Sequence, residues 1–120
     1  MGGYILDNDE ILTGLILELR RGTIVLSVLG QLKEPTYGYN LVNILAENGI
    51  TIEANTLYPL LRRLEGQGLL ISTWETSGTK PRKYYAKTEK GNEVCVALKK
   101  HWDSIVRSID NLWEVNENEK

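Results

Sequence analysis

The chain has 120 residues, of which 14 are Lys or Arg and 16 are Asp or Glu, so its formal net charge is −2. This length fits one domain, and a hydrophobic share of 42% with a charged share of 25% is ordinary for a globular protein. No apolar run reaches the roughly 20 residues of a membrane-spanning helix, and the N-terminus lacks the features of a signal peptide. The single cysteine, Cys95, excludes an internal disulfide. We therefore expect a cytoplasmic protein with no contact to a membrane.

The charge is unevenly distributed along the chain. Residues 54–90 contain seven Lys or Arg and three Asp or Glu, a net charge of +4. Since the whole chain has a net charge of −2, the remaining residues carry −6. A basic segment on an acidic chain is typical of a protein that binds a polyanion. Chance variation in surface charge would give the same pattern, and the charge alone leaves both interpretations open.

The first part of the chain is predicted to be helical. Apolar residues between positions 11 and 32 recur at helical spacing, and Gly22 is expected to bend or divide the segment before Pro35 ends it. Thr36 is a good N-cap for a second helix, which Asn48 and Gly49 end because both residues tolerate a left-handed backbone. Residues 50–52 are β-prone and form either a small strand or a turn.

The third predicted helix has an apolar side and a polar side. The apolar side has leucines at positions i, i+3, i+4 and i+7, namely Leu57, Leu60, Leu61 and Leu64. The opposite side carries Asn55, Pro59 and Arg62, with Tyr58 and Arg63 at its edges. Because proline fits the first turn of a helix, the helix should begin between residues 53 and 55 and end at Gly66 or Gly68. Arginine suits guanine or phosphate and asparagine suits adenine, so the polar side favours DNA, although two arginines can also be plain solvated surface.

Two β-prone runs follow, separated by T-S-G-T-K-P, and predict a hairpin. The residues at and beside its tip, Lys80, Arg82 and Lys83, provide positive charge for phosphates. Trp74, at the end of the first strand, is expected to cover the base of the hairpin.

A long helix over residues 88–114 is predicted next, with Thr88 as its cap. Its apolar residues are spaced alternately by three and four positions, which is a heptad seam: Cys95, Leu98, Trp102, Ile105, Ile109 and Leu112. The helix would span roughly 40 Å, more than a domain of this size needs for its own core. We therefore expect it to pair with the same helix of a second subunit.

Three helices followed by a hairpin give the winged helix-turn-helix arrangement. The fold class is mainly α with a small β-hairpin (α+β), and it carries a long C-terminal dimerisation helix. We divide the chain into a DNA-binding domain of residues 1–87, the dimerisation helix of residues 88–114 and a flexible tail of residues 115–120. In such a module the third helix enters the DNA major groove, the second braces it, and the hairpin is the wing.

The sequence resembles the PadR family of bacterial transcriptional regulators. The resemblance is carried by R-G-T-I-V-L-S-V-L at 21–29, Y-G-Y-N-L at 37–41, T-L-Y-P-L-L-R-R-L-E-G-Q-G-L-L at 56–70 and P-R-K-Y-Y-A-K-T-E-K-G at 81–91. It implies a dimeric regulator, in most members a repressor of an inverted-repeat operator, and in some a protein that responds to small aromatic compounds or drugs. The single C-terminal helix is similar to the small subfamily. This chain has Glu53-Ala54-Asn55 where the family often has Ser-Pro-Gly.

The resemblance and the polar helix side together give the expected DNA-binding residues: Tyr37, Tyr39, Asn55, Thr56, Tyr58, Arg62, Arg63, Lys80, Arg82 and Lys83. The dimer interface is expected to contain Leu98, Trp102, Ile105, Ile109, Leu112 and Trp113, the last packed on the N-terminal helix of the partner. Two symmetry-related Trp102 side chains could leave a cleft for a planar aromatic or cationic ligand, lined also by Ile11, Leu15 and Asp103. An aromatic residue at a heptad position can equally be plain core.

Two alternatives come from other functional classes. An enzyme is disfavoured because Cys95 and His101 lie on one helix about 120° apart around its axis, and a Cys-His pair needs hydrogen-bond contact. The chain has no Gly-rich phosphate loop and no metal-ligand spacing, so we expect no catalytic residue, cofactor or metal. A winged-helix module that docks proteins without binding DNA is the second alternative, and it would show apolar residues on the exposed side of the third helix.

Overall fold

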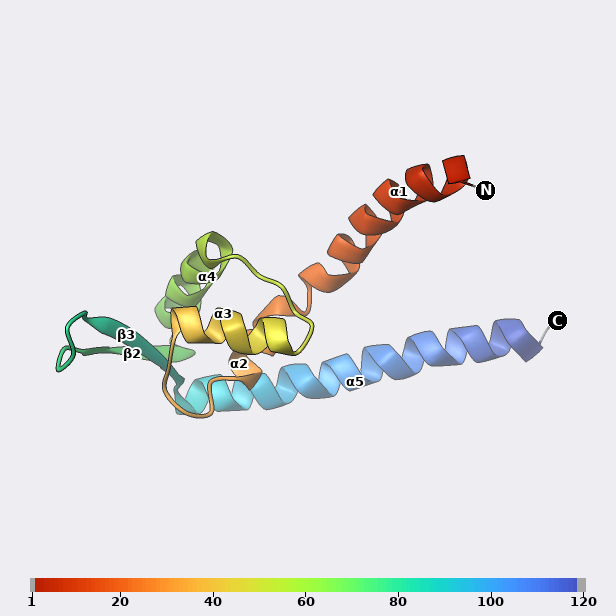
Figure 1. The fold of residues 1–120 in the computed structure, drawn as a ribbon. Coiled ribbons are helices and arrows are strands. Elements are labelled where there is room, and N and C mark those ends of the chain that lie inside the picture. Colours follow the sequence, from red (N-terminus) through yellow and green to blue (C-terminus); the bar gives the residue numbers. More distant parts are fainter. Residues whose placement is uncertain (1, 119–120) are drawn as a thin grey trace.

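The computed structural model describes the backbone of residues 2–118 and the side chains of residues 9–114. The elements follow the order α1 (Gly2–Arg21), α2 (Ile24–Gly30), β1 (Thr36–Tyr37), α3 (Gly38–Glu47), α4 (Ala54–Gly66), β2 (Leu70–Glu75), β3 (Arg82–Lys87) and α5 (Glu89–Asn118). Helices α2 to α4 and the small sheet form a body from which α1 and α5 project as two arms (Figure 1). The predicted fold class is confirmed. No described helix is long and apolar enough to cross a membrane.

One apolar core holds the body together. The stripe predicted on the third helix is buried at Leu57, Leu61 and Leu64, and Leu60 is half-buried beside it. The other fully or nearly fully buried side chains come from α2, α3, the sheet and the connections: Val28, Leu29, Leu32, Leu41, Leu45, Ile52, Leu69, Leu70 and Tyr85. The polar side of α4 is therefore fixed in its orientation by the burial of the opposite side.

The N-terminal helical segment is divided, as Gly22 predicts. Thr23 closes α1 by donating both its N–H and its hydroxyl to the carbonyl of Arg20, at 2.9 and 2.7 Å. Helix α2 ends at Gly30, before Pro35, so the proline is not what stops it. Arg20 also donates to the carbonyl of Gly49 at 2.8 Å, which ties the end of α1 to the body.

The sheet has a third strand that the sequence analysis did not predict. Thr36 was expected to cap the second helix, but it lies in β1, opposite Tyr85 of β3, and Tyr37 is the N-cap of α3. The strand order is β1-β3-β2, and both pairings are antiparallel. We call residues 70–87, which comprise β2, the turn and β3, the wing. The β-prone residues 50–52 form no strand.

Helix α5 begins where the sequence predicts and extends further. Thr88 caps it, since its hydroxyl oxygen accepts from the N–H of Gly91 at 3.0 Å while the hydroxyl donates to the carbonyl of Gly68 at 2.7 Å. The helical backbone continues to Asn118, past the predicted end at residue 114, and positions 119–120 of the predicted tail lie outside the described residues. Leu98, predicted for the dimer interface, is half-buried against the chain's own core together with Val94 and Cys95.

Candidate nucleic-acid interface

Helix α4 has one polar side that faces the wing and another that is exposed to solvent. Tyr58, Arg62 and Glu65, spaced i, i+4 and i+7, lie on the side that faces the wing, whereas Asn55 and Arg63 are exposed away from the core. The predicted start is confirmed, because Glu53 is the N-cap and its carbonyl accepts the N–H groups of residues 56 and 57 at 3.0 and 2.9 Å. Pro59, however, lies inside the helix rather than in its first turn.

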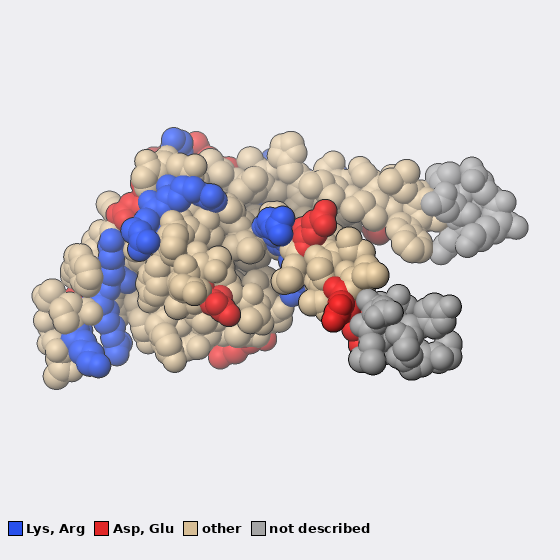
Figure 2. All heavy atoms as spheres, turned by 90° about the horizontal axis from the view of Figure 1, so that it is seen from above, with Lys and Arg blue, Asp and Glu red and all other residues tan. Residues whose placement is uncertain are grey.

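The wing carries its own stabilised turn. The carboxylate of Glu75 accepts hydrogen bonds from the hydroxyl and the backbone N–H of Ser77, and these bonds hold the pKa of Glu75 below its ordinary value of 4.5. Lys80 and Arg82 are exposed at and beside this turn. Figure 2 shows several Lys and Arg side chains at the wing end of the molecule, and others where the arms begin.

A hollow of about 360 Å³ separates α4 from the wing. Its lining combines aromatic and basic side chains: Tyr37, Gly38, Tyr58, Arg62, Trp74, Pro81, Arg82, Lys83 and Tyr85. The guanidinium of Arg82 lies 4.7 Å from the centre of the Tyr37 ring, which in turn meets the Tyr84 ring edge-on at 5.6 Å. An Arg that lies over an aromatic ring can still offer N–H groups to an anion.

Tyr58 is held in place by a glycine. A Cβ added at Gly38 would lie 2.5 Å from Cε1 of Tyr58, so the ring rests directly on the backbone at the start of α3. Tyr58 is consequently half-buried between α3 and α4 rather than free on the helix surface. Only a residue without a side chain allows this close approach.

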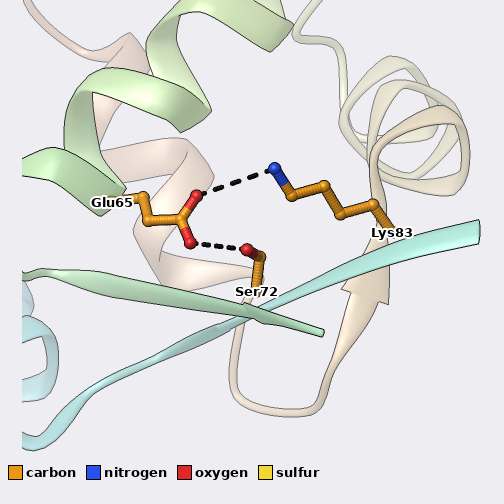
Figure 3. Close-up of polar contacts among 3 residues, drawn as sticks. All are labelled: Glu65, Ser72 and Lys83. Carbon is orange, nitrogen blue, oxygen red and sulfur yellow. Dashed lines mark hydrogen bonds and ion pairs between the residues drawn. The ribbon is translucent and has the colours of Figure 1, made fainter. Parts of the chain in front are cut away.

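Lys83 points inward. Its Nζ lies 3.8 Å from Oε1 of Glu65 and faces the rings of Trp74 at 5.9 Å and Tyr85 at 5.4 Å. The other carboxylate oxygen of Glu65 accepts a hydrogen bond from the hydroxyl of Ser72, so one side chain of α4 meets both strands of the wing (Figure 3). The prediction that Trp74 covers the base of the hairpin is wrong. Trp74 forms the penultimate residue pair before the turn, with Lys83, and its side chain lines the hollow.

The structure brings half of the predicted DNA-binding residues together. Those around the hollow are Tyr37, Tyr58, Arg62, Arg82 and Lys83, and those exposed outside it are Tyr39, Asn55, Thr56, Arg63 and Lys80. Sequence reasoning missed Glu65 and Ser72. The helical spacing of Glu65 from Tyr58 and Arg62 was the available signal, since it puts the three on one side of α4.

The two arms expose apolar side chains. On α5 these include five residues predicted for the dimer interface: Trp102, Ile105, Ile109, Leu112 and Trp113. On α1, Ile11 and Leu15 are 62% and 57% exposed. Asp103 accepts a hydrogen bond from Lys99 at 2.7 Å on the same helix. Because α1 diverges from α5 in both views (Figures 1 and 2), one chain alone does not gather the residues predicted for an effector site.

Comparison with known families identifies the chain. Residues 25–97 match the family described as the Transcriptional regulator PadR-like family. The protein is a PadR-like regulator. The matched range begins in α2 and ends within α5, so it includes α3, α4, the wing and the whole lining of the hollow. The expectation that the protein is not an enzyme is confirmed by its membership of a family of transcriptional regulators.

Individual relatives agree with this membership. A PadR family transcriptional regulator from Eggerthella lenta has 52% identity and a TM-score of 0.86, with 91% of this chain and 97% of that chain covered. A transcriptional regulator of Mycobacterium tuberculosis, Rv3488, is 27% identical over 77% of this chain and 87% of its own length. The structure of Bacillus subtilis PadR in complex with operator DNA shares the fold, with 23% identity, a TM-score of 0.59 and coverage of 63% of this chain and 45% of that one.

Proposed function

We propose that this PadR-like regulator is a homodimeric repressor that binds an inverted-repeat operator through α4 and the wing. One observation carries the proposal: the two elements face each other across the hollow, and each contributes a guanidinium to it, Arg62 from α4 and Arg82 from β3. Among the described side chains neither arginine forms an ion pair with a carboxylate. Both are therefore available to the phosphates that dominate protein affinity for DNA.

The exposed polar residues of α3 and α4 complete the proposed DNA surface. In a winged helix-turn-helix module α4 enters the major groove, so Asn55, Thr56 and Arg63 are placed for base edges or the adjacent backbone. Tyr39, which is 64% exposed at the start of α3, offers a phenol to a phosphate. Bacillus subtilis PadR, which has the same fold, was solved with operator DNA, and this supports the assignment. A regulator that acts on bacterial DNA would work in the cytoplasm.

We propose that the protein dimerises through the exposed apolar face of α5. Beyond Leu98, α5 continues with apolar residues at heptad spacing, and those on its outer part, such as Ile109 and Leu112, are 44% and 64% exposed. Such a long apolar face on a monomer marks an interaction site. A symmetric pairing of two α5 helices would give a two-fold axis, and a two-fold axis corresponds to an inverted repeat in the operator.

A small aromatic ligand between the subunits is proposed to relieve repression. Trp102 is 37% exposed on the seam, so two copies would meet near the two-fold axis. Helix α1 of one copy would have to reach α5 of the other to bring Ile11 and Leu15 to this place. The carboxylate of Asp103 would favour a planar cation. A ligand wedged there would change the distance between the two α4 helices, which must match half-sites about one helical turn apart.

The test is fluorescence anisotropy with DNA from upstream of the protein's own gene and with scrambled DNA, each across a salt series. Binding to the upstream DNA that is tight, falls steeply with salt and saturates at two subunits per site is the expected result. Equal, weak binding to both DNAs would contradict control of its own promoter. No salt-dependent binding to either would favour the alternative, a winged-helix module that docks proteins.

A further inference from the structure

We propose that Glu65 and Lys83 form a strut that sets the position of the wing relative to α4, and that Lys83 is a positioning residue rather than a phosphate contact. The inference rests on the proposed DNA binding and concerns how that surface is held. It differs from the role that the resemblance implies for Lys83, which is contact with DNA.

The carboxylate of Glu65 joins three elements. Glu65 lies near the end of α4, its Oε2 accepts the hydroxyl of Ser72 in β2, and its Oε1 pairs with Lys83 in β3 at 3.8 Å (Figure 3). The side chains of Glu65 and Lys83 are 33% and 32% exposed, so solvent screens the pair only in part. A single carboxylate on α4 thus fixes both strands of the wing.

The strut acts where β3 loses its backbone pairing with β1. Strand β1 pairs with β3 only at Tyr84 and Tyr85, and Lys83 is the next residue toward the turn. From Lys83 outward, β3 pairs with β2 alone. Because an isolated two-stranded hairpin is only marginally stable in water, the outer half of the wing needs an attachment at this point.

The surroundings of Lys83 also argue against a phosphate contact. Its ammonium faces the rings of Trp74 and Tyr85 as well as the carboxylate of Glu65, so its partners are already supplied from within the chain. Glu65 and Lys83 together carry no net charge. A neutral pair releases no counterion when DNA binds, whereas each cation that contacts a phosphate does.

The two interpretations predict opposite effects of Glu65→Gln on the affinity for DNA. The substituted amide could still accept from the hydroxyl of Ser72 but would not pair with the ammonium of Lys83. If Lys83 contacted phosphate, removal of a neighbouring negative charge would tighten DNA binding. If the strut positions the wing, binding to a random-sequence duplex at low salt should weaken by about threefold to tenfold. Tighter binding by Glu65→Gln would overturn the proposal.

The salt dependence provides a second, independent readout. Lys83→Met keeps an apolar stem against the two rings, and it should weaken binding without changing the slope of log affinity against log salt. The matched control is Arg82→Gln, one residue away on the same strand, which should reduce that slope by about 0.9 per subunit. An equal reduction of the slope by Lys83→Met would show that Lys83 contacts DNA and would overturn the proposal.

A measurement without DNA separates the strut from the proposed function. Amide hydrogen exchange within residues 72–83 should accelerate by about threefold to tenfold in Glu65→Gln and in Lys83→Met. The double variant should exchange no faster than either single variant, because both substitutions break the same contact. The amides of α4 should be unaffected. If the unmodified protein binds no DNA, the proposed function fails while this exchange still tests the strut. Unchanged exchange in both single variants would refute the strut.

Discussion

Gly38→Ala tests whether the contact between Tyr58 and the start of α3 holds α4 in position. An added Cβ would lie 2.5 Å from Cε1 and 2.8 Å from Cζ of Tyr58, in a region where Gly38 is buried. Overpacking of this kind costs about 1–3 kcal/mol, and the higher helix propensity of alanine returns less than about 1 kcal/mol. We therefore expect the free energy of unfolding to fall by about 1–2 kcal/mol, which lowers the melting temperature by about 4–10 °C.

Thermal unfolding followed by circular dichroism measures this change, at one protein concentration because the stability of the proposed dimer would depend on concentration. Gly66→Ala is the matched control. Gly66 is the last residue of α4, whereas Gly38 is the first residue of α3, and a Cβ added at Gly66 would meet no atom within 4 Å, so stability should be unchanged or slightly higher. Gly38→Ala should cost nothing in a Tyr58→Ala background, which lacks the ring. An equal cost in both backgrounds would refute the account, because the ring would then not be the obstacle.

The remaining predictions concern the proposed DNA surface, the wing turn and the seam. Arg62→Ala should cost about 1–3 kcal/mol of DNA-binding free energy and relax sequence preference if the guanidinium reads a base. Lys80→Ala should instead weaken binding to all sequences alike and flatten its salt dependence. Anisotropy with matched and scrambled DNA distinguishes the two results, and equal, sequence-independent losses would assign Arg62 to phosphate. Because the bonds from Ser77 lower the pKa of Glu75, their stabilisation of the turn is present above pH 4.5 and is lost as the pH falls through the lower folded-state pKa. Ser77→Ala removes the bond from the hydroxyl and keeps the one from the backbone N–H, so it should reduce that loss, seen as amide exchange in the turn that depends less on the protonation of Glu75. Trp102→Ala should abolish the response of DNA binding to aromatic ligands. Because Trp102 also lies on the proposed dimer seam, the response is compared at a protein concentration at which the variant binds DNA fully, and an unchanged response would exclude Trp102 from the ligand site.

Features that are encoded locally were predictable from the sequence. The leucine stripe of α4 follows from a 3.6-residue period within a single helix, and burial of Leu57, Leu61 and Leu64 confirms it. The bond that the Thr88 hydroxyl oxygen accepts from the N–H of Gly91 is likewise local, as is the division at Gly22. Such signals need no knowledge of what packs against the element.

Features that depend on distant residues were not predictable in the same way. Thr36 has the side chain of a helix cap, but its backbone pairs with Tyr85, which is far along the chain. A strand as short as β1 has too few residues for an alternating pattern that would predict this pairing. The directions of Trp74 and Lys83 depend on strand register, which sets them opposite each other. A count of basic residues could place Lys83 on the wing but could not show that a carboxylate of α4 already faces it.

If the proposed dimer covers α1, the exposure of this helix in one chain would link its folding to protein concentration. Its described apolar side chains, among them Leu12 and Leu19, are largely exposed in one chain. Gly14 interrupts its middle with a residue of low helix propensity. Helices without tertiary packing are marginal in water, so α1 should be fully formed only when another surface covers it. Folding of the arm and association of subunits would then be one equilibrium, and dilution would melt the first helix before it disturbed the body. The concentration of the protein in the cell would thereby set the fraction of molecules in which α1 is fully folded.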